Sequence, residues 1–329
     1  MPNQIINSEC ILHACTIQGD GSGQPLTGKD ITQEIKSHDL AWVHLDATHP
    51  DTRKWLESEV SYLDPLILDA LLADETRPRI VEYDNGMMMI LRGMNLNEKA
   101  EPEDMVSIRI WVDESRIISL RRRRLKAVSD IRDLLANGTG PKDSGDFISM
   151  LSAKLFERME PVLTELDEKL DDIEELILDN PEPSERQAIT SLRKQAIIFR
   201  RYIAPQRDVM MHLRTSDQVW LSTAHKRRIQ ENLDRVTRYI EDLDSMRERA
   251  QVIKDELANA LSDRLNKNLY ILSVISAIFL PLGFFTGLMG INIGGMPGVD
   301  NNNAFWVFSA LLITIVACQV LIFKKLKWF

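Results

Sequence analysis

Two apolar segments near the C-terminus constrain this chain more than any other feature. Residues 269–289 and 304–323 are each about 20 residues long, enough for a helix to cross the hydrocarbon core of a bilayer. The only Asp, Glu, Lys, Arg or His from residue 269 to residue 323 is Asp300, which lies in the connecting loop. The residues before 260 are charged and soluble in character. The sequence therefore predicts a large aqueous domain joined to a two-helix membrane hairpin, rather than two buried helices of a soluble protein.

Basic residues predict the orientation of the hairpin. They flank it on both outer sides and are missing from the loop: Arg264, Lys267, Lys324, Lys325, Lys327. Loops and tails rich in Lys and Arg stay in the cytoplasm, so both termini are expected there. Residues 1–7 lack the pattern of a signal peptide, and the hairpin itself is expected to direct insertion. In a bacterium this corresponds to the inner membrane.

Composition narrows the function of the aqueous part. The chain has 329 residues and a formal net charge of −9, which argues against a nucleic-acid partner. Its three cysteines, Cys10, Cys15 and Cys318, suggest no disulfide framework and suit a reducing compartment. The sequence contains no nucleophile elbow, P-loop or dinucleotide fingerprint, so we do not expect an enzyme.

Residues 1–145 alternate between strand and helix patterns. The expected strands share period-2 or continuous apolar patterns: 42–46, 86–91, 105–112 and 116–120. The last two are expected to form a hairpin around residues 113–115. The expected helices are 51–59, 65–73 and 125–135. This alternation predicts an α/β domain with a mixed sheet flanked by helices, closed by a turn at residues 137–141.

The rest of the chain is helical. A cytoplasmic helical region is expected at 146–222. It begins with one amphipathic helix to Leu178 and continues with a second helix, which is capped by Ser184 with Gln187 and kinked by Pro205. The remaining segments are a stalk helix that continues into the first span, a periplasmic loop, the second span and a basic tail: 223–290, 291–303, 304–323 and 324–329.

One face of the first span is small or polar and the rest is bulky. Steps of 3.5 residues place these residues on that face: Asn266, Leu269, Ser273, Ser276, Leu280, Gly283, Gly287 and Gly290. Small residues allow membrane helices to approach closely, but such a stripe can also line a water-filled channel. The pattern alone favours neither reading. A two-span protomer cannot enclose a pore, so a channel requires several copies.

The end of the first span resembles a known family. Gly290-Ile291-Asn292 closes the first of two C-terminal spans, Pro281 lies inside that span, and lysines follow the second. This arrangement resembles the CorA metal-ion transporter superfamily, whose hallmark is Gly-Met-Asn. Residues 63–69 and 77–84 resemble the cytoplasmic domain of that family. With Ile at the middle position and the loop 294–297, the chain is most similar to the ZntB zinc-transporter branch.

The resemblance implies a homopentamer. The first spans would surround an axial pore, the second spans would face lipid, and the long helices would form a cytoplasmic funnel. This selects the channel reading of the stripe. Gly290, Ile291 and Asn292 would form the outer mouth, where amide and carbonyl oxygens could hold a divalent ion through its water shell.

The resemblance also assigns roles along the pore. Leu269, Leu272 and Leu280 would be hydrophobic constrictions, and Ser273 and Ser276 would supply hydroxyls. The cytoplasmic end of the pore would lie at Asn266, and a basic collar there would comprise Lys324, Lys325 and Lys327. Two departures concern the outer mouth, because Ile291 replaces Met and the residue directly after Pro297 is Gly298 rather than an acid.

The cargo expected from the resemblance is zinc, with proton coupling, and no resident cofactor is expected. Zinc prefers His and Cys ligands, whereas the predicted pore offers only oxygens, which suit a hydrated hard cation such as Mg2+. Neither span contains a carboxylate or a His that could relay protons. The alternatives are a Mg2+, Co2+ or Ni2+ channel on the same scaffold, or a membrane adaptor that transports nothing.

For four other features of the sequence, a structural role is favoured over a functional one. Cys10, His13 and Cys15 lie in one expected strand, where only His13 and Cys15 share a face. The acidic face at 168–179 is either a solvated surface or a cation sink inside the funnel. Residues 121–124 are four arginines at a strand end, without interleaved aromatics. Cys318 is expected to be apolar surface, and His212 and His225 need no functional role.

Overall fold

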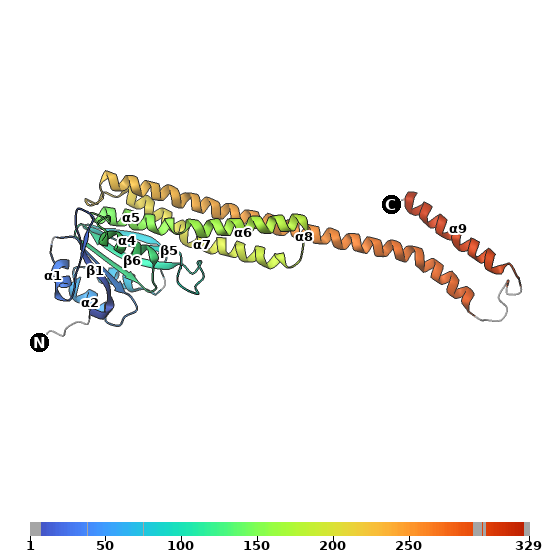
Figure 1. Ribbon diagram of the computed structural model, residues 1–329, viewed down its shortest axis with the longest axis horizontal. Coiled ribbons are helices and arrows are strands. Elements are labelled where there is room, and N and C mark those ends of the chain that lie inside the picture. Colours follow the sequence, from blue (N-terminus) through green and yellow to red (C-terminus); the bar gives the residue numbers. More distant parts are fainter. Residues whose placement is uncertain (1–7, 38, 75, 292–297, 299–300, 326–329) are drawn as a thin grey trace. The chain divides into compact units, whose positions relative to one another are not determined.

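The computed structural model describes residues 8–37, 39–74, 76–291, 298 and 301–325 (Figure 1). It divides into two compact units, residues 1–255 and 256–329. The first unit contains a sheet and most of the helices. The second contains the end of α8 (Thr223–Gly290) and α9 (Ala304–Lys325).

The sheet of the first unit is mixed, as predicted. In the described part of the chain its seven strands follow the order β2-β1-β3-β7-β6-β5-β4, and only β3 and β7 pair in parallel. The bounds are β1 Ile11–Ile17, β2 Gly23–Pro25, β3 Ala41–Asp46, β4 Arg79–Tyr83, β5 Gly86–Gly93, β6 Val106–Asp113 and β7 Arg116–Arg121. The predicted hairpin is confirmed, since β6 and β7 pair in antiparallel orientation with Val112 opposite Ile117.

Helices cover both faces of the sheet. One core joins apolar side chains of the strands, such as Val43 and Leu120, to those of α1 (Lys29–Ile35), α2 (Thr52–Glu59) and α3 (Pro65–Leu72). The alternate side chains of β3 point the other way, where the ring centroids of Trp42 and Phe147 are 5.0 Å apart. Phe147 belongs to α5 (Ser144–Glu157), which follows α4 (Lys126–Ala136). The period of 2 along β3 therefore supplies two separate cores.

The expected helix from residue 146 to 178 is two helices, which corrects that prediction. The helix α5 ends at Glu157, and α6 (Glu160–Asp179) begins after Arg158 and Met159. Pro161 lies in the first turn of α6, where the missing N–H costs nothing, whereas inside a continuous helix it would remove the bond to the carbonyl of Glu157. The apolar periodicity continues across this break, which is why it suggested one helix.

The next helix, α7 (Glu185–Thr215), contains Pro205 in its interior. Its predicted capping box is wrong. Ser184 occupies the N-cap, but its side chain makes no cap hydrogen bond and contacts the carboxylates of Glu182 and Glu185 instead. Figure 1 shows α6, α7 and the first part of α8 alongside one another, and the ion pair of Arg200 with Asp244 at 2.6 Å joins α7 to α8.

Several elements were not predicted. The strands β2 and β4 and the helix α1 are short, and β4 is an edge strand in which exposed and half-buried residues mix. Cys10 belongs to a short 3-10 helix, Ser8–Cys10, rather than to the strand that contains His13 and Cys15. Brief, half-exposed elements give weak periodic signals, and this explains the omissions.

Candidate functional site

The second unit contains the predicted membrane hairpin. Its two long helices each include an 18-residue window with high mean hydropathy, 2.1 in α8 and 2.4 in α9. Few residues of these windows are buried, 6% in α8 and none in α9. Apolar helices whose side chains are exposed within one protomer need another apolar environment, such as lipid or further copies of the chain.

The stripe of small and polar residues lies on the exposed side of α8. Between residues 269 and 290, the buried and half-buried positions form one face: Val274, Ala277, Ile278, Pro281, Leu282 and Phe285. Ala277 on this face contacts α9. Because each residue turns a helix by about 100°, Ser273, Ser276, Leu280, Gly283 and Gly287 fall on the opposite face. The stripe therefore points away from the second span.

Among the described residues, nothing fills the space beside the stripe glycines. A Cβ atom built on Gly283, Gly287 or Gly290 meets no heavy atom within 4 Å. The three leucines that were expected to form constrictions are also exposed, by 51% at Leu269, 60% at Leu272 and 74% at Leu280. A face of this kind is available either to neighbouring helices or to water.

The polar members of the stripe are Ser273, Ser276 and Asn266. Ser273 Oγ donates to the carbonyl of Leu269 at 2.8 Å, which leaves its oxygen lone pairs able to accept from water. Ser276 and Asn266 are exposed on α8.

A polar contact joins the two spans where the first helix lacks a hydrogen bond. Pro281 has no N–H, so it cannot donate to the carbonyl of Ala277 four residues earlier. Gln319 Nε2 on α9 donates to that carbonyl at 3.2 Å. In lipid an unpaired carbonyl is costly, and a polar side chain from a neighbouring helix is one way to satisfy it. Sequence reasoning missed Gln319, although a lone Gln inside a span is a recognisable signal.

The outer and inner ends of the hairpin are described only in part. The helix α8 ends at Gly290, and Ile291 is 45% exposed. Asn292 lies outside the described residues. At the other end, Lys324 and Lys325 are exposed at the C-terminus of α9, and Lys327 lies outside the described residues. Cys318 is exposed on α9.

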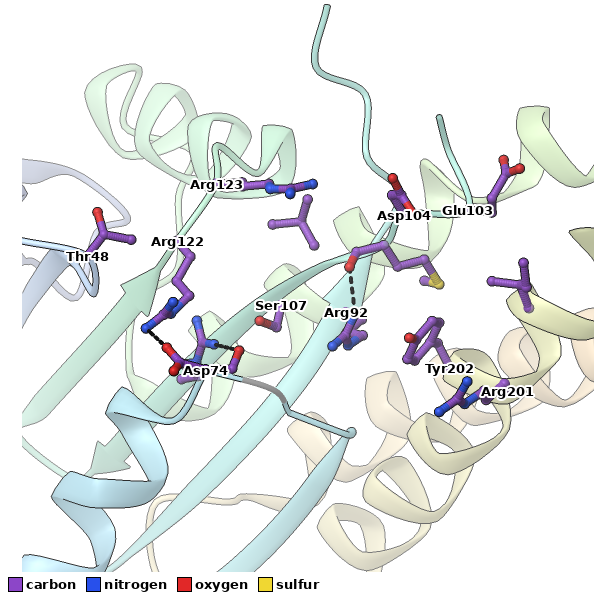
Figure 2. Close-up of a pocket in the computed structure, with 14 residues that line it drawn as sticks. Thr48, Asp74, Arg92, Glu103, Asp104, Ser107, Arg122, Arg123, Arg201 and Tyr202 are labelled. Atoms are coloured by element: carbon purple, nitrogen blue, oxygen red, sulfur yellow. Dashed lines mark hydrogen bonds and ion pairs between the residues drawn. The ribbon is translucent and has the colours of Figure 1, made fainter. Parts of the chain in front are cut away.

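The arginine run after β7 does not form a flat basic surface. Arg122 and Arg123 line a cavity of about 700 Å³ in the first unit, together with arginines from β5, β6 and α7 (Figure 2). Arg122 pairs with Asp74, which also lines this cavity. Two of the four consecutive arginines therefore contribute to a concave site, which the sequence alone did not indicate.

The acidic face of α6 is partly neutralised. Arg249 of α8 binds Asp167 at 3.1 Å and Glu174 at 2.8 Å, and it also binds Asp171. Asp171 was one of the residues in the expected cation sink. The remaining members of that face are exposed: Glu168, Asp172, Glu175 and Asp179.

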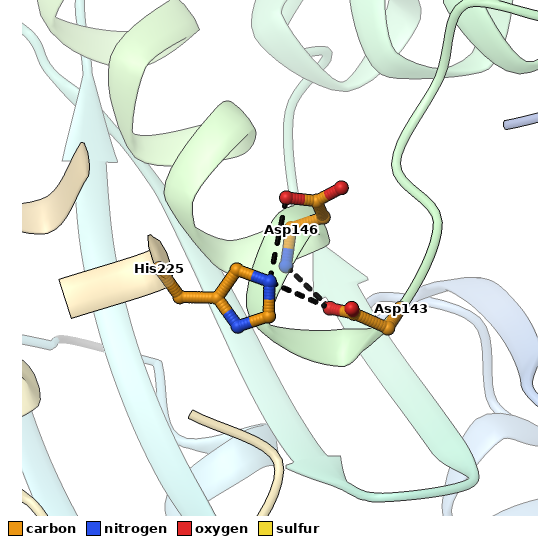
Figure 3. Close-up of side chains that lie close together, drawn as sticks. All are labelled: Asp143, Asp146 and His225. Atoms are coloured by element: carbon orange, nitrogen blue, oxygen red, sulfur yellow. Dashed lines mark hydrogen bonds and ion pairs between the residues drawn. The ribbon is translucent and has the colours of Figure 1, made fainter. Parts of the chain in front are cut away.

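One cluster has the composition of a metal site, namely Asp143, Asp146 and His225 (Figure 3). His225 Nε2 lies 3.3 Å from Asp143 Oδ1 and 3.5 Å from Asp146 Oδ1. Its Nδ1 accepts the backbone N–H of Ser222 at 3.2 Å, so the ring proton is on Nε2 and points at the carboxylates. A metal on Nε2 would need that proton on Nδ1 instead, and the contact with Ser222 opposes this.

The other contacts of the cluster are structural as well. Asp143 caps α5 by accepting the N–H of Asp146 at 2.8 Å, and Arg228 pairs with Asp146 at 2.5 Å. The cluster thus joins the first turn of α5 to the first turn of α8. Its chemistry favours a clamp between two helices over a metal site.

The cysteine and histidine residues near the N-terminus also have structural roles, because they pack within the first unit. His13 lies against Trp42 with ring centroids 5.0 Å apart, and burial lowers the pKa of His13. Cys15 is buried, which raises its pKa to about 12, so its thiol stays protonated. These residues do not form a group of metal-ligand geometry in the part of the chain that is described.

Comparison with known proteins gives consistent relatives. The profile of the family described as CorA-like Mg2+ transporter protein matches residues 37–325. Zinc transport protein ZntB of Pectobacterium carotovorum is 33% identical over 317 residues, which cover 96% of this chain and 95% of the relative. Divalent cation transporter CmaX of Pseudomonas aeruginosa is 34% identical over 321 residues, covering 97% and 96%. The solved full-length CmaX structure has a TM-score of 0.83 at 34% identity, with 97% and 98% coverage.

Proposed function

This chain belongs to the CorA family, and from that premise we propose that it transports divalent metal cations, zinc foremost, across the bacterial inner membrane. The relatives support the cargo, because several that match nearly the whole chain are named as zinc transport proteins. The route is an axial pore lined by the first span, and both termini lie in the cytoplasm.

The observation that carries this proposal is the placement of the stripe on α8. Its small and polar positions face away from α9, and its glycines have open space beside them. Copies of α8 arranged around an axis would turn these positions toward a shared centre, with α9 outside. One hairpin cannot enclose a pore, so the active unit is a homo-oligomer, which we propose to be a pentamer.

The proposed pore handles its cation through oxygen atoms. Asn292 carboxamides and the Gly290 carbonyl form a ring at the outer mouth, where they hold a divalent ion through its waters. Ser273 and Ser276 offer hydroxyls further along. Leu269, Leu272 and Leu280 narrow the path and exclude water when the pore is closed. Asn266 marks the cytoplasmic end, and the lysines after α9 form a basic collar there.

Proton coupling of the proposed transport uses pore water or groups of the cytoplasmic domain. The spans contain no carboxylate or His that could carry a proton across the bilayer. Proton coupling therefore does not rest on a titratable side chain of the spans, and it can be tested by imposing a pH gradient.

The decisive experiment is flux into proteoliposomes that contain the purified full-length chain. Uptake of Zn2+, Mg2+, Co2+ and Ni2+ is compared in parallel, with and without a pH gradient. Zinc uptake that exceeds empty-liposome leakage supports the proposal, and acceleration by the gradient supports coupling. Uptake of Mg2+ alone would remove the zinc assignment, and the oxygen-only pore makes that the main rival. Absence of flux for every cation would favour a membrane adaptor.

A further inference from the structure

The cavity lined by the arginines that follow β7 has the composition of an anion site. We call it the arginine pocket, defined by Arg92 of β5, Arg109 of β6, Arg122 and Arg123 after β7, and Arg201 of α7. Figure 2 shows Arg122 and Asp74 on one side and Arg201 with Tyr202 on the other. Three carboxylates also line it among the described residues, from Asp74, Glu103 and Asp104. Positive charge exceeds negative charge across this lining.

Arg109 is the most unusual member of the arginine pocket. Its side chain is fully buried, at 0% exposure. Its Nη2 donates to the carbonyls of Ala73 at 2.9 Å and Asp74 at 3.5 Å. Its Nε and Nη1 have no hydrogen-bond partner among the described residues. A buried guanidinium with unused donors is costly unless an acceptor reaches it.

The charges around Arg109 increase that cost. Burial lowers its pKa to about 10, and the nearby positive charges of Arg122 and Arg92 act in the same direction. An anion in the pocket would reverse the effect by supplying opposite charge at the same place. The acid beside Arg122, Asp74, has its side chain 82% exposed and already pairs with Arg122.

Two further arginines are exposed at the cavity and free for a ligand. Arg123 and Arg201 form no ion pair within the described part of the chain, and the Arg201 guanidinium carbon lies 5.7 Å from the centre of the Tyr202 ring. Arg92 has a fixed structural role, since it donates to the carbonyls of Met105 at 2.7 Å and Thr76 at 2.6 Å. It also lies over the Tyr202 ring at 4.2 Å.

We propose that the arginine pocket binds a phosphate-bearing small molecule about as large as a nucleotide. Guanidinium groups present paired donors that match the oxygens of phosphate, and several of them together favour a polyanion. The cavity, at about 700 Å³, lies within the range of small-molecule sites and exceeds what one phosphate fills. Tyr202, Met105 and Ile198 give it a less polar wall for an organic portion.

This assignment is independent of the transport proposal, because every residue that carries it lies in the first unit. A phosphate compound bound there would be a ligand of the cytoplasmic domain rather than cargo. Cation flux and ligand binding are therefore measured separately, and failure of one leaves the other standing.

The test is calorimetric titration of the purified full-length chain in detergent with inorganic phosphate, pyrophosphate and ATP. EDTA is present, so that metal-bridged binding is removed. We expect one saturable site per chain for ATP, tighter than for pyrophosphate, and weakening with added salt. No saturable binding of any of the three would overturn the proposal. Inorganic phosphate binding as tightly as ATP would overturn the assignment to a larger molecule.

Variants then locate the site without disturbing buried groups. Arg123→Ala and Arg201→Ala should each weaken ATP binding by about tenfold or more, the usual effect of losing a charge-assisted hydrogen bond. Arg227→Ala, an exposed arginine of α8 outside the cavity, is the matched control and should leave the affinity unchanged. Equal losses in all three variants would contradict the assignment.

A substitution that is expected to tighten ATP binding excludes misfolding as the cause of the losses in the arginine variants. Asp74→Asn removes the carboxylate that occupies Arg122, so it should tighten ATP binding several-fold while the arginine variants weaken it. Thermal unfolding of each variant confirms that the domain remains folded. Weaker binding in Asp74→Asn would show that Arg122 does not contact the ligand, and it would sink the proposed geometry.

Discussion

Gln319 of α9 donates a hydrogen bond from Nε2 to the backbone carbonyl of Ala277 in α8, across 3.2 Å. That carbonyl has no helical donor because the residue four positions later is Pro281. The contact therefore does two things at once. It satisfies a backbone group that lipid cannot satisfy, and it fixes which face of α8 is turned to α9. The stripe of small residues is left on the opposite face as a consequence.

Gln319 and Pro281 should be coupled in a double-mutant cycle. Gln319→Leu leaves the Ala277 carbonyl unpaired and should cost about 1 kcal/mol, the scale measured for polar contacts between membrane helices. In a Pro281→Ala background the helix regains its own N–H donor, so the same change should cost close to nothing. Thermal unfolding of the four proteins in detergent measures the difference. Equal costs in both backgrounds would show that the contact is unrelated to the proline.

Gly283 should tolerate a large side chain in the protomer but not in a conducting assembly. No heavy atom of the described part of the chain lies within 4 Å of a Cβ at this position, so Gly283→Leu should leave folding of the chain intact. If copies of α8 line a pore, the added side chains should reduce cation flux at least about tenfold by closing a wetted path. Ala310→Leu, at an exposed position of α9, is the matched control. Equal flux in both variants would place Gly283 outside the path.

Asn292 should be required for transport and dispensable for assembly. Asn292→Ala removes the proposed ring of amide oxygens, and we expect flux to fall by more than about tenfold because the mouth loses its water-ordering acceptors. Size-exclusion chromatography or native mass spectrometry should show the same oligomer as the unchanged chain. Undiminished flux would exclude Asn292 from the mechanism.

His44 should make the first unit less stable in acid. Burial lowers its pKa to about 3, assisted by the charge of Arg121, whereas the unfolded chain has an ordinary value near 6.5. Between these values the unfolded state binds a proton that the folded state does not. Stability is therefore fully present above about pH 6.5 and is lost as the pH falls toward 3, at up to about 1.4 kcal/mol per pH unit.

A substitution isolates this contribution. His44 Nδ1 lies 2.8 Å from Ser119 Oγ, and Asn at the same position offers a similar acceptor without titrating. His44→Asn should therefore flatten the dependence of the unfolding temperature on pH between 6 and about 4.5. Superimposable pH profiles for the two proteins would show that His44 does not control acid stability.

Gly145 should not accept even a methyl group. Inside a helix, Gly→Ala ordinarily stabilises by about 0.5–1 kcal/mol. Here a Cβ would lie 2.1 Å from His225 Nδ1, so we expect Gly145→Ala to destabilise the first unit by about 2 kcal/mol. Removing the ring with His225→Ala should abolish the penalty, which denaturation of the single and double variants can measure. A persistent penalty would mean that another neighbour is responsible.

Much of this architecture could be read from local pattern. The apolar length of residues 269–289 and 304–323 predicted two spans, and both lie within long exposed helices. The turn at residues 113–115 between two apolar runs predicted the β6–β7 hairpin. The same approach joined α5 to α6, because apolar periodicity continues past Pro161 although the backbone hydrogen bonds do not.

The sequence by itself determined which segments are apolar enough for a membrane, where small residues gather on the first span, and that the longer apolar runs within residues 1–145 form strands. These properties depend on residues that are close in the sequence, within one helical turn or along one strand. Only the tertiary structure decided that Gln319 meets Ala277, 42 residues away, that Arg249 neutralises Asp171, and that arginines from four segments share one cavity. Such contacts depend on how distant elements pack, since hydrogen bonds and charges act over a few ångströms of space and not along the chain.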